Sequence, residues 1–426
     1  MTKTTKSERI NNKRKRDGLA GVRKFTTAVL ITISSTISPS STTMIASDNE
    51  ALKMVGKAQS EALPSHVIVP IYLDGNKNMY IKLDVGTPPK TLKMQIDLGS
   101  SLMTITTTQT NVDAPQNRDS RPLFECSESK TCKNLQTQKS ELTTFGDVQG
   151  PLVSDTIVLT DLPSIKITNF TFLSASNAPE DLLESGFDGI VGLGRMEKLN
   201  ALNLNLPPKA QIKSFYNEMK LQNYKIVQHD KFTIIAPRPN IKNNQHYIAF
   251  GAGLSEFLSE EPQEMNITFI PDSWNLQAYE TFIGDTQIML QGEIYTIVLD
   301  NTLQGMFGDY EIINRMMDYQ ELPYEVSCQA KVSDLKFSFY NPIKKPSVNN
   351  TFSANYTSEV IKVKSIRNPN GCRIDFTPIV FPTQTPPMTQ YDIANHVIRK
   401  TLILGNVFLL QLNIEFDEEN DVIRLI

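Results

Sequence analysis

Residues 94–101 read Met94-Gln95-Ile96-Asp97-Leu98-Gly99-Ser100-Ser101, an apolar run that ends in an acid and a small-residue turn. The run predicts a buried β-strand, and Gly99 permits the tight backbone turn that follows it. A carboxylate in such a place can be held at the bottom of a cleft. Taken alone, an Asp at a turn is more often an ordinary turn or capping residue.

A second stretch of the same kind follows 203 residues later, Ile294-Tyr295-Thr296-Ile297-Val298-Leu299-Asp300-Asn301-Thr302. Its uncharged β-type run again ends in an acid and a small polar turn. Two acids that each close a buried strand predict a paired site made by Asp97 and Asp300.

Three further segments accompany these acids. Residues 80–89 contain a Gly-Thr-Pro turn, residues 187–194 read Phe187-Asp188-Gly189-Ile190-Val191-Gly192-Leu193-Gly194, and residues 402–408 with 415–417 form closing apolar runs. In this order, from about residue 66 to the C-terminus, the segments and both acidic stretches resemble the pepsin-like aspartic proteases, peptidase family A1. The resemblance implies a mostly β, bilobal fold with a cleft between two similar β lobes.

The composition agrees with that expectation. The chain has 426 residues, of which 40% are hydrophobic, enough for one or two sizeable cores. From residue 68 onward, short β-type runs alternate with Gly, Pro, Asn and Asp. Helical spacing of apolar residues predicts helices at 208–221, 310–319 and 391–400. We expect an N-terminal lobe at 66–263 with the first Asp, and a C-terminal lobe at 264–426 with the second.

The first 65 residues differ from the rest. Nine Lys and Arg residues lie between positions 3 and 24, and an uncharged stretch follows from Phe25 to Ser47. This order predicts a signal peptide or signal anchor at 1–47, followed by a short linker or propeptide remnant at 48–65. Two alternatives stay open, a nuclear-import patch at 13–16 and a disordered tail.

The four cysteines and four sequons favour the secretory pathway, with secretion or a lysosome- or vacuole-like compartment as the destination. Four cysteines allow three pairings, and the resemblance implies the sequential one, Cys126 with Cys132 and Cys328 with Cys372. The sequons predict glycosylation at Asn169, Asn266, Asn349 and Asn355. Neither a Cys-x-x-Cys motif nor a Cys/His cluster occurs, so we expect no metal. The net charge of −4 gives no reason to expect a nucleic-acid partner.

The resemblance implies an aspartic endopeptidase in which Asp97 and Asp300 activate a water by general acid and base catalysis at acidic pH, without a cofactor. Its partners would be peptide or protein substrates. We expect a monomer, with membrane contact only if the N-terminal segment is an uncleaved anchor.

Several positions around the two acids depart from the family pattern. Members carry Thr or Ser after each Asp, and these hydroxyls bond across the lobes; here Leu98 and Asn301 stand there, which removes the cross-brace in its usual form. Gly99 and Ser100 fit the first motif. Thr302 stands where the family has Gly, and its β-branching restricts the turn.

The predicted substrate-covering hairpin, or flap, lies at residues 141–150 and is shorter than in the family. Phe145, followed by Gly146, takes the place of the family's flap Tyr, and Thr104 takes that of its Trp partner, so both ends of that hydrogen bond are missing. A Phe still offers an apolar lid. Besides the endopeptidase, two alternatives therefore remain: a catalytically impaired pepsin-fold protein that binds peptides or proteins in its cleft, and an inhibitor-binding or structural secreted protein.

Overall fold

The protein is described here by a computed structural model. The residues described are 66–107, 110, 123–143, 145–237, 245–267, 270, 273–320, 325–340, 351–357, 362–364, 371–379 and 398–426. The predicted N-terminal segments at 1–47 and 48–65 lie outside these ranges. Within them, no helix has the length and apolar character needed to cross a membrane.

The largest sheet has 13 strands in the order β11-β24-β23-β9-β10-β1-β2-β3-β8-β4-β7-β6-β5, and β2 also pairs with β6. Strand β2 alternates buried and half-buried side chains, and β4 and β8 are buried throughout, as expected for strands that pack on a core. The strands are β1 (Val67–Leu73), β2 (Met79–Val85), β3 (Lys90–Asp97), β4 (Thr104–Thr106), β5 (Lys133–Thr143), β6 (Gly146–Leu159), β7 (Leu162–Ala175), β8 (Gly189–Gly192), β9 (Lys231–Ile235), β10 (His246–Phe250), β11 (Gln263–Asn266), β23 (Ile414–Asp417) and β24 (Val422–Leu425).

A second sheet of eight strands and a small sheet of three make up most of the rest. The eight-stranded sheet runs β18-β17-β12-β14-β22-β15-β21, with β13 beside β12. Its strands are β12 (Asn275–Ile283), β13 (Thr286–Gln287), β14 (Glu293–Leu299), β15 (Met306–Asp309), β17 (Leu335–Tyr340), β18 (Thr351–Tyr356), β21 (Phe376–Ile379) and β22 (Ile398–Leu404). The small sheet contains β16 (Glu325–Ser327), β20 (Gly371–Ile374) and β19 (Lys362–Lys364).

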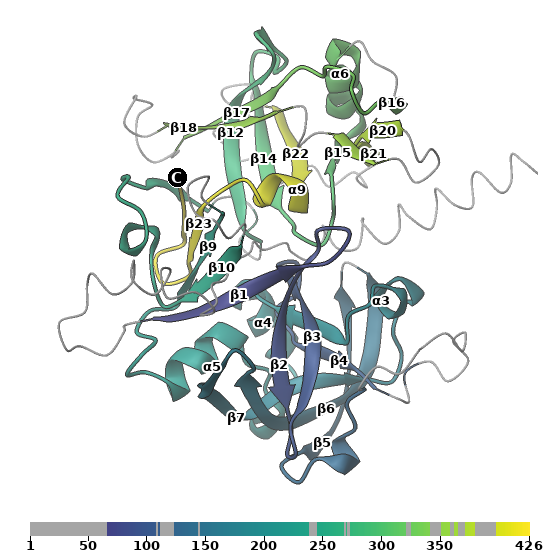
Figure 1. Ribbon diagram of the computed structural model, residues 1–426, viewed down its shortest axis with the longest axis vertical. Helices are drawn as coiled ribbons and strands as arrows, with labels where there is room; N and C mark the ends of the chain where they lie inside the picture. The colour runs from purple at the N-terminus through teal and green to yellow at the C-terminus, as the bar shows by residue number, and fades with distance from the viewer. Residues whose placement is uncertain are drawn as a thin grey trace, which may run out of the picture.

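The eight-stranded sheet lies in one lobe and part of the 13-stranded sheet in the other (Figure 1), which confirms the mostly β, bilobal fold. Figure 1 shows β12, β14, β17 and β22 in the upper lobe, β2 to β7 in the lower one, and β1, β9, β10 and β23 between them. Trp274, just before β12, is buried between the lobes: its ring centroid lies 5.8 Å from that of Phe232 and 5.3 Å from that of Phe416. The predicted lobe boundary, between residues 263 and 264, falls inside β11 and stays a prediction.

Within the described residues, helices are few and short. They are α3 (Glu180–Glu184), α4 (Met196–Asn203), α5 (Phe215–Gln222), α6 (Tyr310–Gln320) and α9 (Asn406–Leu409), with 3₁₀ turns η2 (Cys126–Glu128), η3 (Pro208–Ala210) and η4 (Leu254–Glu256). The helix predicted at 310–319 is confirmed as α6. The one predicted at 208–221 is divided into η3 and α5, because the chain is extended after η3 and Ser214 caps a new helix by accepting from the Asn217 N–H.

The helix predicted at 391–400 is wrong over residues 398–400, which begin β22; residues 391–397 lie outside the described ranges. Strand β22 pairs in parallel with β14 along seven residues, from Ile398 beside Glu293 to Leu404 beside Leu299. The β-branched Ile and Thr residues of this segment suit a buried central strand, and pairing with β14 outweighs its helical spacing.

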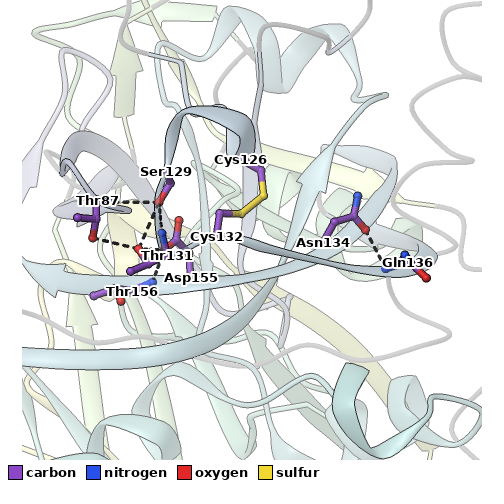
Figure 2. Close-up of a disulfide and its surroundings, with 9 residues drawn as sticks. All are labelled: Thr87, Cys126, Ser129, Thr131, Cys132, Asn134, Gln136, Asp155 and Thr156. Atoms are coloured by element: carbon purple, nitrogen blue, oxygen red, sulfur yellow. Dashed lines mark hydrogen bonds between the residues drawn. A yellow bond between two sulfur atoms is a disulfide. The ribbon is translucent and has the colours of Figure 1, made fainter.

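Both predicted disulfides are confirmed, Cys126–Cys132 and Cys328–Cys372. Figure 2 shows the first one closing a small loop that lies against the hairpin turn at Thr87. The Thr87 N–H donates to Ser129 Oγ over 2.9 Å, and Thr131 Oγ1 donates to Thr87 Oγ1 over 3.0 Å. The small loop therefore supports the hairpin that precedes β3.

Removing the Cys328–Cys372 bond should destabilise the protein more than removing Cys126–Cys132. The sequence separations are 44 and 6 residues, and the longer loop loses more entropy when it is closed in the unfolded chain. The chain-entropy model gives about 4 kcal/mol for the longer loop and about 2 kcal/mol for the shorter. Urea unfolding of the two double Cys→Ala variants measures both values, and an equal or larger loss for the short loop would contradict the expectation.

Candidate active site

Asp97 lies at the end of β3, fully buried. Its Oδ1 accepts hydrogen bonds from the backbone N–H groups of Gly99 (2.7 Å) and Ser100 (3.2 Å). Its Oδ2 has no hydrogen-bond partner among the described residues. One oxygen is thus fixed by the turn and the other is left for a further contact.

The segment at 187–194 packs directly against the loop that holds Asp97. Strand β8 pairs in parallel with β3, with Gly192 beside Asp97. A Cβ atom added at Gly192 would lie 2.7 Å from backbone atoms of Leu102, and one at Gly194 would lie 2.4 Å from Ser101 Oγ. These two glycines are needed because the loop after Asp97 crosses directly over them.

Asp300 occupies the equivalent place in the other lobe. It follows β14, and its N–H donates to the carbonyl of Leu404 in the parallel neighbour β22 over 3.0 Å. A Cβ at Gly405 would lie 2.3 Å from the carbonyl oxygen of Gly305, so the two loops cross closely here as well. The two acidic stretches that resemble each other in sequence therefore also form loops of similar geometry.

Thr302 fits its turn in spite of standing in a Gly position. Its backbone φ is not among the positive values found in the described residues. Its N–H (2.9 Å) and its hydroxyl (2.5 Å) both donate to Asp300 Oδ1. The expected restriction from β-branching is thus offset by an additional donor to the carboxylate.

Burial raises the pKa of both carboxyl groups, and the charge of Asp300 acts on Asp97 as well. Burial, followed by the negative charge of Asp300, raises the pKa of Asp97 to about 7. Burial also raises the pKa of Asp300, against the hydrogen bonds from Thr302 that favour its charged form. The site therefore favours a protonated carboxyl at acidic and mildly acidic pH.

Asn301 joins the lobes beside this pair. Its Oδ1 accepts from the Leu98 N–H over 3.2 Å, and its Nδ2 donates to the Ile96 carbonyl over 2.7 Å. All three groups belong to buried residues. Half of the cross-brace is therefore present, made by the amide of Asn301 in place of a hydroxyl. Leu98 supplies no matching bond, and its side chain packs in the main hydrophobic core.

The flap is the hairpin of β5 and β6. Thr143 pairs with Gly146, so the strands are joined by two residues, of which Phe145 is the second. The Phe145 ring is half-buried and packs on the cluster that contains Leu102 and Val148. Gly146 has a φ of +123°, and a Cβ there would lie 2.9 Å from the Pro179 ring, so only Gly suits this corner.

Thr104 is buried in β4, and its Oγ1 has no hydrogen-bond partner within the described part of the chain. No Tyr–Trp type hydrogen bond therefore secures the flap at this position. In place of that bond, the hairpin turn carries the half-buried Phe145 ring.

Two charged residues near the dyad were missed from the sequence. Lys198 on α4 donates to the Gly99 carbonyl over 2.5 Å, and Glu141 on β5 accepts from Ser100 Oγ over 3.0 Å. Lys198 carried no signal, because a Lys between Glu197 and Leu199 in a short helix of mixed composition does not indicate burial. Glu141 lies in the polar run 139–141, where alternation does not reveal the inward face.

The predicted glycosylation sites stay predictions. Asn169 and Asn355 are exposed, Asn266 is half-buried, and Asn349 lies outside the described residues. Across the described ranges, no group of three or more His, Cys, Asp or Glu side chains could hold a metal ion.

Comparison with known proteins agrees with this geometry. The chain is 30% identical over 139 residues to vacuolar protease A of Neurospora crassa, a match that spans 32% of this chain and 34% of that relative. The matched part is thus about a third of the relative's length. The family model of eukaryotic aspartyl proteases matches residues 78–426, which include both acidic loops and the flap. This chain belongs to the family of eukaryotic aspartyl proteases.

Proposed function

We propose that this protein is an aspartic endopeptidase that hydrolyses peptide bonds with a water activated between Asp97 and Asp300. The observation that carries the proposal is the pair of equivalent loops. Each holds a fully buried acid by its own backbone N–H groups, and the charge of Asp300 acts on the pKa of Asp97.

Two close carboxyl groups cannot both ionise, so they share one proton. The ionised partner accepts a proton from the water as that water attacks the carbonyl carbon of the peptide bond. The protonated partner donates to the carbonyl oxygen. The carboxyl that took the proton from water then donates it to the leaving nitrogen, while the other carboxylate takes a proton from a hydroxyl of the tetrahedral intermediate. The C–N bond breaks, and the pair again shares one proton.

The substrate class follows from the flap. Phe145 presents an apolar ring at the hairpin turn, so we expect preference for bulky apolar side chains beside the cleaved bond. The disulfides and sequons agree with a secretory route. The related Neurospora protein is named a vacuolar protease, which supports an acidic, vacuole-like compartment.

The experiment is cleavage of a quenched peptide with a hydrophobic centre between about pH 3 and pH 8, using chain expressed through a secretory pathway, with and without pepstatin. Because burial and the charge of Asp300 raise the pKa of Asp97 to about 7, activity should fall as pH rises through that value, where the pair loses its last proton. A cleavage rate that pepstatin does not reduce would overturn the dyad assignment.

A second candidate is a catalytically impaired relative that binds peptides or proteins in the same cleft. Leu98 without a hydroxyl and Thr104 without a hydrogen-bond partner among the described residues favour it. The same experiment separates the two, because pepstatin binding without peptide cleavage by a folded sample would support binding alone.

A further inference from the structure

A buried pair of opposite charges lies beside the dyad. The side chain of Lys198 is 7% exposed and that of Glu141 is 1% exposed, and their Nζ and Oε1 atoms lie 3.9 Å apart. They come from different elements, α4 and the flap strand β5. Lys and Glu are seldom this deeply buried unless they are paired.

Both side chains contact the loop that holds Asp97. Lys198 Nζ donates to the Gly99 carbonyl over 2.5 Å, and Ser100 Oγ donates to Glu141 Oε1 over 3.0 Å. The N–H groups of the same two loop residues, Gly99 and Ser100, bond Asp97 Oδ1. The pair therefore contacts the same two residues, Gly99 and Ser100, whose N–H groups position the Asp97 carboxylate.

Stability alone does not account for the pair. Burying two charges costs several kcal/mol per ion, and apolar residues of similar volume are often as stable or more so. The separation of 3.9 Å is also too long for a direct hydrogen bond between Lys198 and Glu141. The more specific contacts of the pair are with the Asp97 loop.

The pair acts on the dyad through charge as well. The positive charge of Lys198 lowers the pKa of both Asp97 and Asp300, while the negative charge of Glu141 raises the pKa of Asp97. Burial raises the pKa of Glu141 itself, opposed by Lys198, by hydrogen bonds from Ser100 and Ser101, and by Lys139 on the same strand.

We propose that Lys198 and Glu141 are positioning residues of the dyad, which anchor the Asp97 loop to the flap and set the pH range in which the two carboxyls share one proton. The proposal rests on the proposed function insofar as the dyad is catalytic. The Lys198–Glu141 pair anchors the Asp97 loop at Gly99 and Ser100. This anchor adds to the Asn301 contact in a loop that has Leu98 in place of a Thr. Because β5 continues into the flap, the same contact links flap position to the dyad.

The test uses Lys198→Met and Glu141→Gln in the full chain. Removing the positive charge destabilises the carboxylates, so Lys198→Met should raise the upper apparent pKa of the dyad. In that variant the pKa of the buried Glu141 should rise further, because the charge of Lys198 that opposes the effect of burial is gone. Glu141→Gln leaves the Lys198 charge uncompensated and should lower the same pKa. We expect opposite shifts of about one pH unit each.

Two readouts are needed, the ¹³C titration of the Asp97 and Asp300 carboxyls by NMR and the pH profile of kcat/KM. Glu141→Gln is the variant that preserves the fold, because its amide oxygen can still accept from Ser100 Oγ. The matched control is Lys213→Met, which breaks another Lys–Glu pair of the same lobe, Lys213–Glu218 at 2.7 Å, and should leave both titrations unchanged.

A purely structural pair would lower stability and rate while both titrations stayed in place, and that result would overturn the proposal. Opposite shifts of the carboxyl titrations in a protein that cleaves no peptide would support the role of Lys198 and Glu141 and contradict the endopeptidase assignment. The two failures are therefore distinguishable.

Discussion

Replacing Asp97 by Asn should reduce kcat/KM for peptide hydrolysis by about 10³-fold, because one of the two proton-transfer groups is lost. The fold should survive, since the amide oxygen of Asn can still accept from the Gly99 and Ser100 N–H groups that now bond Asp97 Oδ1. The measurement is steady-state cleavage of the quenched peptide at the acid optimum of the unaltered protein.

The same variant should change how stability depends on pH. The folded-state pKa of Asp97, about 7, is above its ordinary value of 3.8, because burial disfavours the charged form. The folded protein thus binds a proton that the unfolded chain releases, and this contribution is complete below about pH 4 and lost as pH rises through about 7. Relative to the unaltered protein, Asp97→Asn should gain unfolding free energy between pH 4 and pH 8, on the order of a few kcal/mol.

Asp161→Asn is the control for both measurements. Asp161 is half-buried in the turn between β6 and β7, accepts from Tyr72 Oη over 3.2 Å, and also has a raised pKa through burial. Its replacement should leave peptide cleavage unchanged. If Asp97→Asn retained activity within about tenfold of the unaltered protein, the reaction would have to proceed elsewhere.

The architecture could be predicted from sequence because its signals are local. Strand, acid and turn follow one another within nine residues at each loop, and Gly192 and Gly194 have no side chain because the Asp97 loop crosses them. The sequential disulfides came from family resemblance and are confirmed. The helix predicted at 391–400 is wrong over residues 398–400, because pairing with β14, about a hundred residues earlier in the chain, decides their conformation.

The substitutions at the site could not be judged from sequence, because their partners are distant. Compared with the family motif alone, Asn301 stands for a lost hydroxyl and Thr302 for a lost glycine. In the fold, Asn301 reaches groups 203 and 205 residues away, and Thr302 adds a donor to Asp300. Lys198 and Glu141 were missed for the same reason, since the groups they contact in the Asp97 loop lie 99 and 41 residues away and nothing in their local sequence indicates burial.

Replacing Asn301 by Leu should be the most damaging change outside the two acids. It removes the acceptor for the Leu98 N–H and a donor to the Ile96 carbonyl, both in the buried interface between the lobes. A buried polar group without its partner costs about 1–3 kcal/mol, so we expect a loss of about 3 kcal/mol in unfolding free energy. Urea unfolding at acidic pH measures it.

The rate should fall as well, because Leu98 and Ile96 flank Asp97, and Asn301 adjoins Asp300. A shift of about 1 Å between reacting groups costs about 10²-fold, and we expect a decrease of this size in kcat/KM. The brace positions the acids and does not bind the proton, so the shape of the pH profile should stay the same. That separates Asn301 from Lys198 and Glu141, whose replacement should move the profile.

Asn301→Thr is the matched control, because a hydroxyl can accept from the Leu98 N–H and donate to the Ile96 carbonyl with one oxygen. It should keep more stability and more activity than Asn301→Leu. If both variants lost the same unfolding free energy and the same activity, the volume of the Asn side chain would matter and its two hydrogen bonds would not. If neither lost anything, the lobes would be held by contacts such as Trp274, whose Nε1 donates to the Leu193 carbonyl over 3.3 Å. The missing hydroxyl at Leu98 would then be no reason to doubt catalysis, since the half of the brace that is present would itself be dispensable.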